Sequence, residues 1–449
     1  MSVATATAPQ LGAAPTAPSR PAPSRPARSS ATQPVLAPWL RAQALNLARH
    51  TRALRDFSRT EFGTGAESPT AGHVQGVNQL MARLRSGLVR RAVAMQRLSA
   101  AAIREPSPAR LTRAVTHKHE SHDAVRKIEK IWDFYFELFG QRQSPYGTWL
   151  LGCDRIALDC YQVAYTGMGK AKSVPAPPPF CYMRTGFGPA TFRRGIRMRS
   201  LGRELNPFPL VQLPYHRLVN PWTLGAVLHE VGHNLQNDLG LNLAVPRAIA
   251  RRLLGAGLGT AVAQTWTQWN RESFCDLVGL LLGGPGIVAS LMDVVGRSPE
   301  VAYSFSPDAV HPTPYLRVLL STELLRRMGF AAEAEQYSAA WRRIYAAPQS
   351  GGFPPALLRT APRAIALVVD TVCYQPFQEL GGKRLAEVFR FAQKEQRMIE
   401  EAANRLGKGN DPGIVPERFL IGAARFAIDN RLAPPETIKA NFYSELARR

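Results

Sequence analysis

Two histidines four residues apart, with a glutamate directly after the first, constrain this chain more than any other feature. The stretch reads Leu228-His229-Glu230-Val231-Gly232-His233. Residues four apart in an α-helix lie on one face, so a helix here would point both imidazoles the same way. Two imidazoles on one face can bind a single Zn²⁺, and Glu230 between them can accept a proton from water at the metal.

The residues around this motif predict where its helix begins and ends. Asn220 can cap the N-terminus, Pro221 suits the first turn, and Gly240 suits the position just after the last turn. The same five-residue pattern also arises by chance in ordinary amphipathic helices. A metal site therefore requires further ligands elsewhere in the chain.

The third zinc ligand is expected to be a carboxylate. An extended three-histidine pattern would need Gly at 236 and His at 239, where the chain has Gln236 and Leu239. The best candidate is Glu272, which lies with Asp276 on one face of an apolar helix. Asp276 can accept the N–H of a ligand histidine and fix its orientation. The alternative is that both are solvated helix acids. Cys275, between them, is interpreted as a packing residue.

Three motifs in this order resemble a known family. H-E-x-x-H, then Glu272-x-x-x-Asp276, then His311-Pro312 followed by Arg317 resembles the gluzincin metallopeptidases, including the CAAX prenyl protease and bacterial heat-shock membrane metalloproteases. The resemblance implies a zincin-like core with Zn²⁺ on His229, His233 and Glu272. Glu230 would be the general base, and His311 or Arg317 would donate to the oxyanion. The stretch 232–236 also resembles the enhancin-like gluzincins, which leaves the subfamily open.

The rest of the chain predicts an α+β fold that is predominantly α, with a small mixed sheet preceding the active-site helix. Residues 1–38 read as a disordered, basic, Pro/Ala-rich segment, 39–142 as a helical N-terminal region, 143–345 as the catalytic core and 346–449 as a helical C-terminal region. Helices are expected at 39–62, 74–103, 123–139 and 383–406. Strands are expected at 147–151, 155–158, 180–183, 197–198 and 208–214. The prolines around the last of these favour a sheet edge, where an extended peptide could pair.

Composition bounds the location and the partners. The five cysteines are scattered, and no secretory signal or apolar stretch of membrane-spanning length is visible, so a cytoplasmic protein without transmembrane segments is expected. The formal charge of +23 favours an acidic partner, although it also arises from biased base composition. The arginines Arg83, Arg85, Arg90 and Arg91 and the histidine cluster at 117–122 are interpreted as solvated helix faces.

The resulting prediction is a zinc metallopeptidase that acts on a protein or peptide substrate. The alternative is a basic nucleic-acid- or partner-binding protein with a non-catalytic zincin-like core. Intact Glu230 favours the first.

Overall fold

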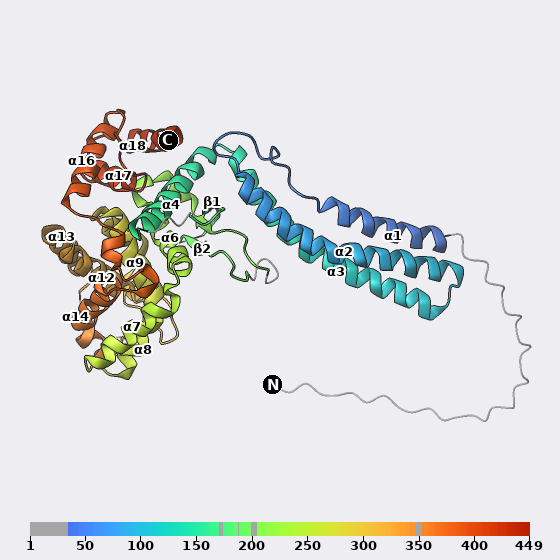
Figure 1. Cartoon of the computed structure of the whole chain (residues 1–449), viewed down its shortest axis with the longest axis horizontal. Helices are drawn as coiled ribbons and strands as arrows, with labels where there is room; N and C mark the ends of the chain where they lie inside the picture. Colours follow the sequence, from blue (N-terminus) through green and yellow to red (C-terminus); the bar gives the residue numbers. More distant parts are fainter. Residues whose placement is uncertain (1–34, 170–173, 187, 199–203, 347–352) are drawn as a thin grey trace, which may run out of the picture.

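A computed structural model describes residues 35–169, 174–186, 188–198, 204–346 and 353–449 (Figure 1). This part of the chain is predominantly helical and holds one small mixed sheet, as predicted. Residues 1–34 of the predicted disordered segment lie outside the described residues, and a helix already begins at Leu36. No described helix is both long enough and apolar enough to cross a membrane.

Three long helices form an arm that projects from the rest of the molecule (Figure 1). They are α1 (Leu36–Ala53), α2 (Ala71–Arg104) and α3 (Pro108–Gly140). The Thr70 side chain caps α2 and the Ser107 side chain caps α3, each by accepting a backbone N–H three residues on. The three helices expected in this region are confirmed, although α1 ends nine residues before the predicted position 62.

The strands predicted at 147–151 and 155–158 are wrong, because these residues form helix α4 (Gly147–Gly167). Its buried positions include Leu150, Cys153, Ile156 and Cys160. These recur every three to four residues, which is the helical period. The strands were predicted from segments of only four or five residues. Such a segment is too short to show the helical period, since a short apolar run fits either a strand or a buried helix.

The sheet has three strands: β1 (Phe180–Met183), β2 (Ala190–Phe192) and β3 (Leu210–Leu213). β3 lies in the centre, parallel to β1 and antiparallel to β2. The strands predicted at 180–183 and 208–214 are confirmed, but placing the second at an edge was wrong. Its prolines flank the paired residues and so remove no ladder hydrogen bond. Arg197 forms only an isolated bridge with Leu205, so no strand occupies 197–198.

The sheet separates two hydrophobic cores, because side chains along a strand alternate between its faces. Phe180 and Leu210, which are paired across β1 and β3, belong to the core of the arm. Cys181 and Val211, the next pair, belong to the core of the body. The sheet therefore joins the base of the arm to the body.

The remaining helices form the body, whose single core extends from Leu150 to Leu446 and so joins the two regions predicted at 143–345 and 346–449. They are α5 (Tyr215–Val219), α6 (Gly225–Asp238), α7 (Leu241–Gly255), α8 (Thr260–Gln268), α9 (Asn270–Gly283), α10 (Gly286–Val295), α11 (Pro299–Ala302), α12 (Pro314–Arg327), α13 (Ala331–Ile344), α14 (Pro355–Val369), α15 (Leu385–Val388), α16 (Gln393–Gly407), α17 (Phe419–Asp429) and α18 (Pro435–Arg448). The helix predicted at 383–406 corresponds to α15 and α16.

Candidate metal centre

Helix α6 carries the H-E-x-x-H motif in its central turns. Asn220 does not cap it as predicted, because a short 3₁₀ turn, Pro221–Thr223, comes first and α6 begins at Gly225. The predicted end is confirmed: Gly240 follows the C-cap residue Leu239 and has a left-handed φ of 76°.

Glycines allow α6 to approach α9 closely. Gly232 lies on α6 directly before His233. A Cβ atom added to it would lie 3.1 Å from the Cα of Cys275. A Cβ added to Gly279 would lie 3.6 Å from the backbone nitrogen of His229. The contact at Gly279 would be an ordinary one, so it is the absence of a side chain at Gly232 that lets the two backbones meet, and this brings the histidines of α6 beside the carboxylates of α9.

The carboxylate of Glu272 lies against both imidazoles. Its two oxygens are 3.3 Å from Nε2 of His229 and 3.4 Å from Nε2 of His233, and the residue is only 7% exposed. Ligand atoms about 2.0–2.1 Å from a tetrahedral zinc lie about 3.3–3.4 Å from one another. Each of the two distances is one that a pair of zinc ligands would have, although they involve different oxygens of Glu272, and the sequence-predicted ligand Glu272 does not face solvent.

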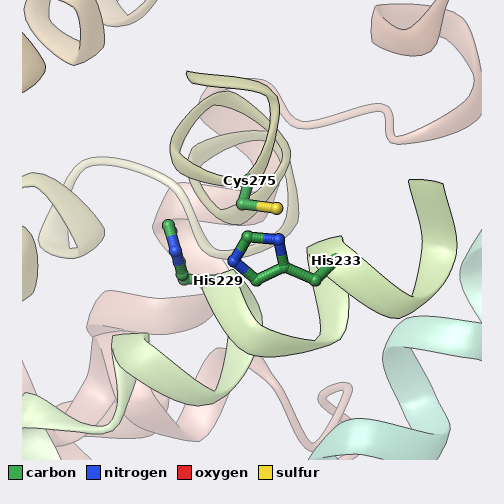
Figure 2. A group of neighbouring side chains, drawn as sticks. All are labelled: His229, His233 and Cys275. Atoms are coloured by element: carbon green, nitrogen blue, oxygen red, sulfur yellow. The ribbon is translucent and has the colours of Figure 1, made fainter. Parts of the chain in front are cut away.

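Cys275 offers a second candidate for the third ligand. Figure 2 shows Cys275 above the imidazole of His233, with His229 to one side, and its Sγ and one nitrogen of each histidine lie within 4.8 Å of one another. The imidazole ring centres of His229 and His233 are 5.0 Å apart. The sequence predicted that Cys275 packs and is not a ligand; it does pack against Gly232, but its Sγ also lies near both imidazoles, which was not predicted. Burial raises the pKa of this thiol well above its usual value, so the thiol is protonated in the absence of a metal ion.

Asp276 holds His229 from the side away from Glu272. Its Oδ1 lies 2.8 Å from Nδ1 of His229, although the ring N–H is not aligned well enough for a regular hydrogen bond. Arg317, from α12, donates two hydrogen bonds to the same carboxylate: Nε to Oδ2 at 2.8 Å and Nη2 to Oδ1 at 2.7 Å. All three side chains are largely buried. Arg317 therefore fixes Asp276, and Asp276 lies against the His229 imidazole, which is an arrangement found around many metal-binding histidines.

A cavity of about 580 Å³ opens beside this cluster. Glu230 lines it together with His229 and Glu272, and apolar side chains of α10, such as Ile287 and Leu291, line it as well. The volume is within the range of ligand pockets, about 300–1,000 Å³. Glu230 is 4% exposed, and burial raises its pKa to about 7.

His311 lies where the cavity meets solvent. Its side chain is 65% exposed, yet its Nε2 is 3.6 Å from Oε1 of Glu272. It also lines the cavity with Pro312. The His-Pro segment, about 80 residues from the α6 histidines in the sequence, thus reaches the cluster in space.

The electrostatics of the cluster suit a cation. Although burial opposes it, Asp276 and Glu272 raise the pKa of His229 to about 10, whereas burial and His229 lower the pKa of His233 to about 3. Against the effect of burial, the neighbouring histidines and Arg317 hold the pKa of Glu272 well below its usual value. Two ionised carboxylates thus share one imidazolium, whose proton a metal ion replaces on binding.

All seven residues that the sequence singled out meet in this region: His229, Glu230, His233, Glu272, Asp276, His311 and Arg317. Sequence reasoning missed Cys275 as a possible ligand and the glycines that bring α6 and α9 together. The available signal was Gly232 on α6 together with Gly279 and Gly283 on α9.

No protein-family model, curated protein or solved structure matches this chain.

Proposed function

We propose that the chain is a zinc-dependent metallopeptidase with a zincin-like core of the gluzincin type. The observation that carries the proposal is the convergence of His229, His233 and the Glu272 carboxylate at zinc-ligand spacing. Glu230 lies beside them in a cavity large enough for a substrate. The three motifs that resemble gluzincins lie far apart in the sequence, so their meeting in space supports one common role.

Each residue has a role that follows from its position. Bound zinc would supply a Lewis acid that polarises a peptide carbonyl and makes water more acidic. The Glu230 carboxylate accepts a proton from water in the cavity and returns it to the leaving amine nitrogen. The apolar cavity walls limit competing solvent, and they hold the substrate beside Glu230.

His311 and Arg317 take different roles in the proposal. His311 is exposed at the cavity, so its imidazole can donate to the substrate oxygen as negative charge develops there. Arg317 is already engaged in two hydrogen bonds with Asp276, which favours a positioning role over direct contact with substrate.

The sheet supports a peptide as the substrate. β2, and not β3 as predicted, is the edge strand on this side, and Gly188 and Pro189 just before it line the cavity. A hydrogen bond from Asn234 of α6 to Thr191 of β2, 2.8 Å long, fixes the strand against the site helix. Edge strands can bind an extended peptide through backbone hydrogen bonds.

The test is to separate metal binding from hydrolysis. Glu230→Gln should bind one zinc per chain, as the wild-type chain does, and should lose peptidase activity on unfolded protein substrates, because the amide cannot accept the proton. His311→Gln should also retain zinc, and it should lower kcat by about 10²–10³ if the imidazole donates to the oxyanion. Glu436→Gln, an exposed change on α18, is the matched control.

Two results would reject these assignments. Full activity in Glu230→Gln would exclude it as the base, and loss of zinc in His311→Gln would make that residue a ligand. A wild-type chain that binds zinc and cleaves no substrate would favour the non-catalytic alternative.

A further inference from the structure

Helix α2 has an unusually one-sided charge. Its 34 residues include six arginines and neither aspartate nor glutamate. The similarly long helix α3 and the helix α16, in contrast, mix both signs. The charge of α2 is therefore not compensated along its own surface.

Four of these arginines form a regular row. Arg83, Arg90, Arg97 and Arg104 follow one another at intervals of seven residues, and all four are exposed. A helix drifts only about 20° per seven residues, so the four lie on one face within about 60°. At a rise of about 1.5 Å per residue, they are about 10.5 Å apart and span about 32 Å. We call these four residues the arginine stripe.

The stripe has no carboxylate partner among the described residues, in contrast to its neighbours on the same helix. Arg85 pairs with Asp56, and Arg91 lies 3.8 Å from Glu120. Within the described part of the chain, no aspartate or glutamate oxygen lies within 4.0 Å of a stripe guanidinium. Their charge is thus available to a partner.

A groove between α2 and α3 runs along part of the stripe. Arg90 and Arg97 line it from α2, and Arg113 lines it from α3. Glu120 is the one acidic side chain among its described lining residues. Val89 and Val93, 52% and 40% exposed, lie between the arginines. Besides the stripe arginines, the groove therefore has one further arginine, Arg113, and its one acidic side chain, Glu120, lies 3.8 Å from Arg91, which is not a stripe residue.

Three classes of anionic partner fit such a surface differently. A membrane-surface helix needs large apolar side chains such as Trp, Phe and Leu on the face that enters the lipid. The exposed apolar residues of α2 are small, and the helix contains no Phe, Trp or Tyr. A single-stranded nucleic acid needs aromatic rings on which bases stack, which α2 also lacks. A duplex requires only cations aligned with its phosphates, and the stripe is nearly as long as one turn of about 34 Å.

We propose that the arginine stripe of α2 binds the phosphate backbone of double-stranded nucleic acid without reading its sequence. The arm projects from the body, so a duplex along α2 leaves the metal centre accessible (Figure 1). This inference goes beyond the proposed peptidase activity and does not depend on it. It would place a peptidase beside proteins that are bound to the same duplex.

The test is binding of the full chain to duplex DNA and duplex RNA, measured by fluorescence anisotropy between about 50 and 200 mM salt. The stripe variant changes Arg83, Arg90, Arg97 and Arg104 to Gln, which preserves helix propensity. The matched control changes four exposed arginines of the body, Arg342, Arg343, Arg359 and Arg363, to Gln and so removes the same charge. Circular dichroism checks that both variants keep the helical content of the wild type.

The stripe variant should bind at least about tenfold more weakly than the wild type. The slope of its log affinity against log salt should also be smaller in magnitude by about 3 to 4, because each of the four lost phosphate contacts contributes about 0.9 to the slope. The control should resemble the wild type. Equal binding by the stripe variant and the wild type, or an equal loss in the control, would overturn the proposal. So would wild-type binding to phosphatidylserine vesicles or single strands in preference to both duplexes. Glu230→Gln should bind the duplex like the wild type, so this result is separate from the fate of the peptidase proposal.

Discussion

At the scale of single residues, the centre depends on a buried chain of charges. Arg317 contacts Asp276, Asp276 contacts His229, and His229 contacts Glu272. Removing one partner from a buried ion pair leaves the other charge desolvated, which costs about 3–5 kcal/mol, whereas surface pairs contribute about 0–1 kcal/mol. The buried ion pair of Arg317 with Asp276 should therefore stabilise the site more than a surface ion pair of the same helix does.

Arg317→Met should therefore destabilise the chain by about 3–5 kcal/mol and weaken zinc binding by about 10–100-fold, because Asp276 no longer holds His229. Chemical unfolding and competition with a zinc chelator measure the two effects. Arg326→Met, on the exposed side of the same helix, removes only a surface pair with Glu323 and should cost less than about 1 kcal/mol. Similar losses in both variants would contradict the positioning role of Arg317.

The identity of the third ligand is also decided at this scale. The carboxylate of Glu272 lies 3.3 and 3.4 Å from the two imidazoles, whereas the thiol of Cys275 is protonated until a metal ion binds. With Co²⁺ in place of zinc, we expect no thiolate-to-cobalt absorption in the near ultraviolet, no spectral change in Cys275→Ala, and at least about tenfold weaker metal binding in Glu272→Gln. A strong thiolate band that disappears in Cys275→Ala would instead make Cys275 the ligand.

At the scale of elements, the site is made by the contact between α6 and α9. Neither helix supplies all three candidate ligands by itself, since the histidines lie on one and the carboxylate on the other. Their separation is set by Gly232, where even one methyl group would meet the backbone of Cys275 at 3.1 Å. Close-packed helices respond to such a change by shifting apart or by straining side chains.

Gly232→Ala should therefore cost about 1–3 kcal/mol and lower zinc affinity, even though alanine favours the helical state. Gly255→Ala is the matched control: Gly255 is also helical, and a Cβ there would meet nothing within 4 Å. It should be neutral or stabilise the chain by up to about 1 kcal/mol. Thermal unfolding and zinc titration distinguish the two, and unchanged zinc binding in Gly232→Ala would refute the role given to this contact.

At the scale of the whole molecule, the arm and the body meet through a small polar and aromatic junction. His73, in the first turn of α2, is 3% exposed and packs its ring against Phe180 and Phe208. Its Nε2 lies 2.9 Å from the carbonyl oxygen of Pro178, and its Nδ1 is 2.8 Å from the hydroxyl of Thr70. Burial lowers the pKa of this histidine to about 4.

This shift predicts a loss of stability in mild acid. An unfolded histidine binds its proton near pH 6.5, well above the folded value, so the stabilising effect is complete above about pH 6.5 and is lost as the pH falls toward 4. Between about pH 7 and pH 5, the wild type should lose about 2 kcal/mol more than His73→Gln, whose amide can still donate to Pro178. Urea unfolding at both pH values tests this, and equal losses in the two chains would exclude His73 as the cause.

The sequence was most informative where a pattern is local. The helix predicted at 74–103, the helix end at Gly240 and the three motifs can be recognised from residues that are close together in the sequence. Short apolar runs were less informative, because residues 147–158 fit the length of two strands and are buried in one helix. The prediction that residues 208–214 form an edge strand was wrong. Their prolines lie just outside the paired residues, so they remove no hydrogen bond from the sheet.

The sequence by itself determined which side chains could form a metal site, because the ligand types and their helical spacing are properties of the chain alone. Only the tertiary structure decided that they meet. Glu272 reaches His229 and His233 because glycines let two helices touch, Arg317 arrives from a third helix to hold Asp276, and Cys275 comes within reach of the same point. Contacts between helices depend on how closely the helices pack, and the spacing of residues along one helix does not determine that distance.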